Sequence, residues 1–98
     1  MRIVLRIENE DKEFISDFIP GRVFREAVKA QSMLQNSDKL TDEELDGLVM
    51  LVVNTYGKQF TVDQFWDGID ARDVMTTIVD TVLGALQRVN DGGSEDTQ

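Results

Sequence analysis

The chain is 98 residues long, which predicts one domain with a modest core. It contains neither Cys nor His, so disulfides, thiolate metal sites and histidine general bases are excluded. Its net charge is −9, and residues 36–98 carry thirteen acidic against four basic side chains, whereas residues 1–35 carry six of each. Because such a surface repels phosphate groups and anionic lipids, we expect no binding to nucleic acid or to membranes.

The N-terminal residues, MRIVLRIENED, lack the long apolar segment of a signal peptide. The chain also has no run of about 18 apolar residues that could span a bilayer. Since a reducing compartment suits a chain without thiols, we expect the protein in the cytoplasm.

Residues 2–19 show the pattern of a β-hairpin. Residues 2–7 alternate between two faces, residues 9–12 are polar, and residues 13–19 offer a second alternating strand. A two-stranded hairpin is only marginally stable in water, so it needs a further packing partner. We expect it to pack on the helices of its own chain, and pairing through its edge, including self-association, is the alternative.

Four helices are expected after the hairpin, at about residues 21–34, 41–56, 61–68 and 70–89. The second is the central helix, because its run from Leu48 to Val53 is apolar on every side. The polar, glycine-rich end over residues 91–98 is expected to be disordered. The sequence therefore predicts an α+β fold in a single domain over residues 1–90, with an N-terminal β-hairpin followed by a bundle of about four helices.

Local signals mark the ends of two of these helices. Thr41 and Glu44 form a capping box, in which each side chain bonds the backbone N–H of the other residue. Thr61 and Gln64 repeat this arrangement. Gly57 is free to take the left-handed conformation that closes the central helix.

The last helix carries a wide apolar stripe, from Val74 to Val89. Its residues Val79, Leu83 and Leu86 belong either to the core or to a docking surface for a partner. Trp66, in the preceding short helix, is likewise a candidate for core or interface. Gly84 interrupts the last helix, so either the glycine is tolerated there or another backbone passes close by.

A basic cluster lies on one side of the helix over residues 21–34. Arg22, Arg25 and Lys29 share this side. They could hold an acidic group of a partner or of a sister subunit, or they form a solvated helix face.

No arrangement of residues indicates an enzyme, a metal site or a cofactor. Four aspartates gather around the short helix, namely Asp63, Asp67, Asp70 and Asp73, but their spacing does not match a calcium-binding loop. Glycine-rich phosphate loops are missing, and without His or Cys an enzyme would depend on carboxylates alone. We therefore expect a non-enzymatic interaction protein without cofactors.

Three blocks of sequence carry a family resemblance. They are MRIVLRIENEDKEF at the start, GRVFREAV after the proline, and YGKQFTVDQFWDGIDARD between the last helices. In this order they resemble the tail assembly chaperones of long-tailed phages and prophages of Gram-positive bacteria. The similarity covers about residues 1–86, and the segment after Val89 departs from the family pattern.

The resemblance implies a chaperone that binds the long helical tape measure protein, keeps it soluble and helps recruit the tail tube protein. It implies action in the cytoplasm of the bacterial host and absence from the mature virion. Members are often made in two lengths by a programmed frameshift, and the short form would match this chain. We expect the tape measure segment to lie against the exposed part of the last helix, with Trp66 nearby.

Two other classes of protein stay open at this point. An acidic DNA mimic that inhibits a DNA-binding protein is suggested by the charge of residues 36–98. The other class is a virion structural protein such as a tail terminator.

Overall fold

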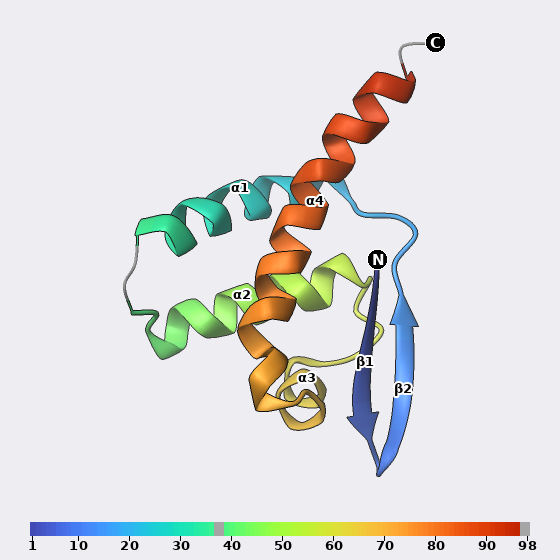
Figure 1. The fold of residues 1–98 in the computed structure, drawn as a ribbon, viewed down its shortest axis with the longest axis vertical. Coiled ribbons are helices and arrows are strands. Elements are labelled where there is room, and N and C mark those ends of the chain that lie inside the picture. Colours follow the sequence, from blue (N-terminus) through green and yellow to red (C-terminus); the bar gives the residue numbers. More distant parts are fainter. Residues whose placement is uncertain (37–38, 97–98) are drawn as a thin grey trace.

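An antiparallel β-hairpin leads the chain and four α-helices follow it, as Figure 1 shows for the computed structural model. The structure describes residues 1–36 and 39–96, and the side chains of residues 1–35 and 39–87. The elements are β1 (Arg2–Ile7), β2 (Glu10–Ile15), α1 (Gly21–Asn36), α2 (Asp42–Thr55), α3 (Val62–Gly68), the 3-10 turn η1 (Ala71–Asp73) and α4 (Val74–Asp96). The predicted α+β class, with a hairpin followed by four helices, is confirmed.

The hairpin turn is tighter than the sequence pattern predicts. Glu8 and Asn9 form a two-residue turn with positive φ angles of 54° and 66°, the backbone form that matches the twist of paired strands. The second strand therefore runs from Glu10 to Ile15, and the predicted turn over 9–12 and strand over 13–19 are wrong. The sequence signal is weak because Glu rarely adopts a positive φ.

Two side chains attach the end of β2 to the chain that follows α2. The Ser16 hydroxyl donates a hydrogen bond of 2.7 Å to the backbone carbonyl of Thr55. The Gln59 amide donates one of 2.8 Å to the backbone carbonyl of Ile15. Beyond this point Phe18, which the sequence pattern places in the strand, lies outside it and is 77% exposed.

The predicted helix ends are confirmed at α2 and α3. Thr41 and Glu44 form both hydrogen bonds of their capping box, at 2.9 and 3.1 Å. Thr61 and Gln64 form both of theirs, at 2.9 and 3.0 Å. Gly57 follows α2 with a φ of 66°, the left-handed conformation that the sequence predicts there.

Helix α2 is the centre of the hydrophobic core. It packs against α1, α3 and α4, so most of its circumference is covered. Its buried residues are Leu48, Val49, Leu51, Val52, Val53 and Thr55. Met50 is 46% exposed, so the expectation that α2 is buried on every side is wrong at this position. Phe60 and Phe65 complete the core.

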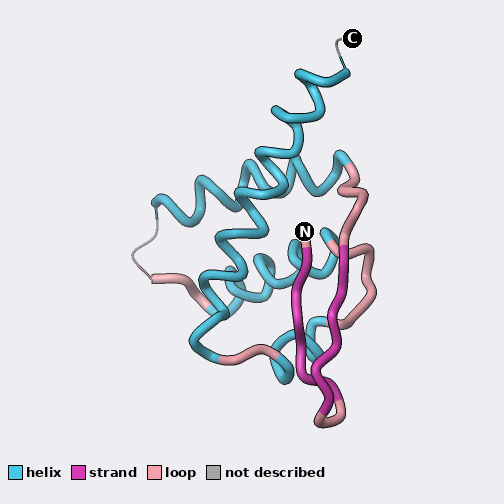
Figure 2. The backbone as a smooth tube through the Cα atoms, turned by 45° about the vertical axis from the view of Figure 1, so that its right-hand side comes forward, coloured by secondary structure: helices cyan, strands magenta, loops and turns pink. Residues whose placement is uncertain are grey.

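Helix α4 continues to Asp96, whereas the sequence predicts an end near Val89. Each of Gly92 and Gly93 weakens a helix by about 1 kcal/mol relative to Ala, but neither removes a backbone N–H as proline would. Views from two directions show this end projecting beyond the other elements (Figure 1, Figure 2). The side chains of residues 91–98 lie outside the described ones, and the disorder expected for these residues stays a prediction.

Within the described ranges, none of the helices combines the length and the hydropathy needed to cross a membrane.

Candidate partner-binding surfaces

Helix α4 presents one side to the core and another to solvent. Its core side holds the buried residues Ile78, Val82 and Ala85. On the other side Leu83 is 40% exposed and Val79 is half-buried, and we call this pair the outer face of α4. Leu86 is half-buried and packs against the core. Of the three predicted docking residues, Leu83 is therefore the most accessible, and Leu86 contributes partly to the core.

Trp66 lies on α3, which packs against β1 and α2, whereas α4 packs against α1 and α2. The indole is half-buried and meets the ring of Phe65 edge-on, with centroids 5.7 Å apart and planes at 83°. Trp66 also packs against the core cluster. Trp66 and Leu83 therefore lie on helices with partly different packing neighbours, and a joint role of the two in binding stays a prediction.

Arg22 and Arg25 are both exposed in the first half of α1. Helix α1 packs against α4, so these arginines and the outer face of α4 lie on neighbouring helices (Figure 1). Their part in binding stays a prediction.

Several exposed apolar side chains lie outside the residues that the sequence pattern marks for binding. They are Val4, Ile15, Phe18, Val28, Met50 and Met75. Strand alternation places Val4 on the outward side of β1 with Arg2 and Arg6, so the sequence pattern itself indicates that Val4 is exposed. The others depend on which neighbours cover each element, and a single helix or strand pattern does not contain that information.

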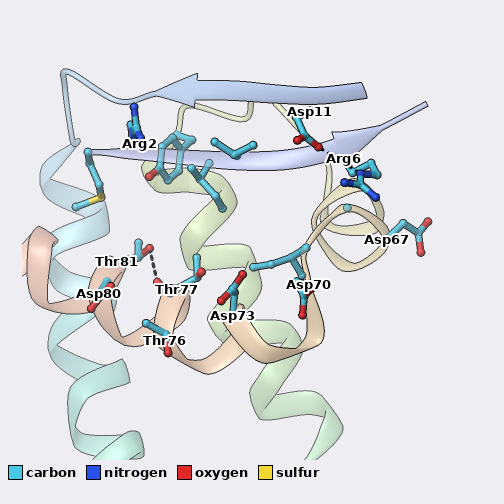
Figure 3. Close-up of a pocket in the computed structure, with 16 residues that line it drawn as sticks. Arg2, Arg6, Asp11, Asp67, Asp70, Asp73, Thr76, Thr77, Asp80 and Thr81 are labelled. Carbon is cyan, nitrogen blue, oxygen red and sulfur yellow. Dashed lines mark hydrogen bonds and ion pairs between the residues drawn. The ribbon is translucent and has the colours of Figure 1, made fainter. Parts of the chain in front are cut away.

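A cavity of about 620 Å³ lies between β1 and the first half of α4 (Figure 3). One wall is a polar stripe at helical spacing, formed by Asp73, Thr76, Thr77, Asp80 and Thr81. The opposite wall is β1, with Arg2, Val4 and Arg6. The Thr81 hydroxyl donates to the Thr77 carbonyl at 2.7 Å, which satisfies this buried hydroxyl. In the last helix the sequence pattern marks only apolar residues for binding, so it does not identify this polar side.

Two titratable groups of the cavity have shifted pKa values. Burial raises the pKa of Tyr56 to about 12. Hydrogen bonds from the Arg72 side chain and backbone lower the pKa of Asp70 below its ordinary value of 3.8. Within the described residues, no three acidic side chains are grouped as ligands for a metal ion, and this includes the four aspartates around α3.

Comparison with known proteins identifies the family of the chain. A family model described as phage tail chaperone protein matches residues 1–98. The chain belongs to the phage tail chaperone family. No curated protein and no solved structure matches it.

Membership of the phage tail chaperone family confirms the resemblance inferred from the three sequence blocks. The protein is a viral chaperone of tail assembly with a largely helical fold. This finding favours the chaperone class over an acidic DNA mimic and over a tail terminator.

Proposed function

We propose that this phage tail chaperone binds the tape measure protein through the outer face of α4 and promotes assembly of the tail tube. In this proposal it acts without catalysis in the cytoplasm of the host and is absent from the mature virion. Its partners are the tape measure protein and the tail tube protein.

The exposed apolar surface of α4 is the observation that supports this proposal. Leu83 is 40% exposed on a helix whose opposite side is committed to the core. A partner helix that covers this surface would bury apolar area on both molecules, and such burial stabilises by about 25 cal/mol per Å² before the costs of association. Grooves and faces of this kind bind the apolar side of an amphipathic helix.

Co-purification of the tape measure protein with this chain tests the proposal. The double variant Val79→Asp with Leu83→Asp places two charges on the outer face and should abolish co-purification while circular dichroism stays helical. Met50→Asp is the matched control, since Met50 is equally apolar and 46% exposed on another helix. The control should bind as the wild type does.

Three results would contradict the proposal. One is binding by a folded double variant, and another is equal loss of binding in the Met50→Asp control. The third is detection of the chaperone in purified virions by mass spectrometry. If the double variant unfolds, the single variant Leu83→Asp replaces it, because Leu83 is the more exposed of the two.

A further inference from the structure

The two edges of the hairpin differ in what they offer to another chain. The Ser16 N–H donates to the Met1 carbonyl at 2.9 Å, so Met1 and Ser16 form a hydrogen-bonded pair. Hydrogen-bonded and non-hydrogen-bonded residue pairs alternate along an antiparallel ladder. The next hydrogen-bonded pair is therefore Ile3 with Phe14. The N–H and C=O groups of Arg2, Val4 and Arg6 therefore point away from β2, toward α4 and the cavity.

Two glycines fix the ends of this edge. A Cβ atom on Gly68 would lie 2.7 Å from the Arg6 carbonyl oxygen, so only glycine lets α3 approach β1 there. At the other end the Met1 side chain lies against Gly84 of α4. Between these contacts the backbone of Arg2 and Val4 borders the cavity. Within the described residues, no hydrogen bond reaches their outward N–H and C=O groups.

The β1 edge borders the cavity, whereas the β2 edge lies on the outer side of the hairpin (Figure 1). On the β2 edge the Ile15 carbonyl, which points outward in this register, already accepts the hydrogen bond from Gln59. Four of the six β2 residues are charged, and charges at an edge discourage pairing with another strand. The β1 edge is therefore the one that the cavity offers to a partner.

The charges around the cavity select for a basic occupant. Both arginines of β1 are already paired, Arg2 with Glu13 at 2.7 Å and Arg6 with Asp11 at 3.2 Å. Asp73 and Asp80 lie in the opposite wall, so the cavity has an excess of negative charge. Figure 3 shows Asp73 of η1 and Thr77 and Thr81 of α4 on the side that faces β1, whereas Thr76 and Asp80 lie farther from the strands.

We propose that this cavity binds an extended segment of another polypeptide that carries Lys or Arg at alternate positions. The segment pairs through its main chain with the outward groups of Arg2 and Val4, and its basic side chains reach Asp73 and Asp80. Addition of a strand to an open sheet edge is an established mode of peptide recognition. The volume of about 620 Å³ is within the range of roughly 300 to 1,000 Å³ for ligand cavities. This surface is separate from the outer face of α4 and does not depend on the tape measure protein.

Synthetic peptides with alternating Lys and Val test the proposal on the full chain. Fluorescence anisotropy compares this peptide with a Glu-for-Lys peptide and with one N-methylated at alternate residues. The basic peptide should bind, and the other two should bind at least about tenfold more weakly, because Glu side chains are repelled by Asp73 and Asp80 and N-methylation removes main-chain hydrogen-bond donors. Amide NMR signals of Arg2 and Val4 should shift and become protected from exchange.

Val4→Pro is the decisive variant. It removes one outward N–H and keeps the β1–β2 hydrogen bonds, because proline is tolerated where the N–H faces away from the ladder. The expected loss of affinity is about tenfold. Ile15→Pro, at an outward position of the β2 edge and outside the ion pairs of β1, is the matched control and should bind within about twofold of the wild type. Asp73→Asn with Asp80→Asn should weaken binding and reduce its salt dependence.

Several outcomes would overturn the proposal. Equal binding of the N-methylated peptide would show association by charge alone, and absence of binding by the basic peptide would remove the site. Concentration-dependent dimerisation by sedimentation, lost in Val4→Pro, would make a second copy of this chain the occupant. If Val4→Pro unfolds, the N-methylated peptide and the NMR shifts in the wild-type protein decide the question without it.

Discussion

Helices α2 and α4 both contribute apolar residues to the core but differ in how completely they are covered. Three helices surround α2, and six of its residues are buried, whereas α4 has neighbours on only part of its circumference and leaves Leu83 and Met75 exposed. A run of apolar residues therefore becomes core only where other elements surround it. On α4, whose circumference is only partly covered, the exposed apolar residues leave surface for a partner.

The largest expected effect comes from a charge placed in α2. Val52 is fully buried, so Val52→Asp should unfold the protein, because an unpaired buried charge costs several kcal/mol against a total stability of about 5 to 15 kcal/mol. Far-UV circular dichroism and urea denaturation measure the effect. Met50→Asp, two residues earlier and exposed, should stay folded. A cooperative unfolding transition for Val52→Asp at the wild-type midpoint would show that α2 is not the centre of the core.

A smaller effect is expected at the start of α2. Thr41→Ala removes the side-chain acceptor of the capping box and should lower the free energy of unfolding by about 1 kcal/mol. Thr41→Ser keeps the hydroxyl and should lose much less. Urea denaturation of the two variants compares them directly, and equal stabilities would mean that packing alone fixes this end of α2.

The smallest effect is expected where α4 begins. Hydrogen bonds from Arg72 hold the pKa of Asp70 below its ordinary value, so the pKa is lower in the folded than in the unfolded chain. The stabilisation is present above about pH 4 and is lost as the pH falls through the folded pKa. Asp70→Asn should remove this part of the acid dependence. Both side chains are largely exposed, so the difference between the two pH profiles of the thermal midpoint should be small.

A pH profile of Asp70→Asn that is steeper than that of the wild type would contradict the assigned direction of the shift. A substitution at Thr61 is the control for this measurement. Its capping box contains no ionisable side chain, so the pH profile should keep the shape of the wild-type profile.

Local signals in the sequence were sufficient for the helix ends but not for the surfaces. Thr41 and Thr61 were predicted correctly as caps, because a capping box depends on residues only three positions apart. The hairpin turn was missed, since Glu8 gives no sign of its positive φ. The fold class followed from the order of these local elements.

The cavity could not be predicted, because it forms where β1 and α4 approach each other from opposite ends of the chain. One of the two explanations for Gly84 was the close approach of another backbone, but the atoms that lie there belong to the Met1 side chain. The exposure of Leu83 also depends on which helices surround α4. Such facts require the assembled fold.

The hydrogen bond from Gln59 to Ile15 ties the end of β2 to the segment that follows α2. The Ser16 hydroxyl reaches the Thr55 carbonyl beside it, so two side-chain contacts hold the outer strand, whereas α3 packs against the inner strand, β1. The hairpin is thereby anchored to the helices through both of its strands.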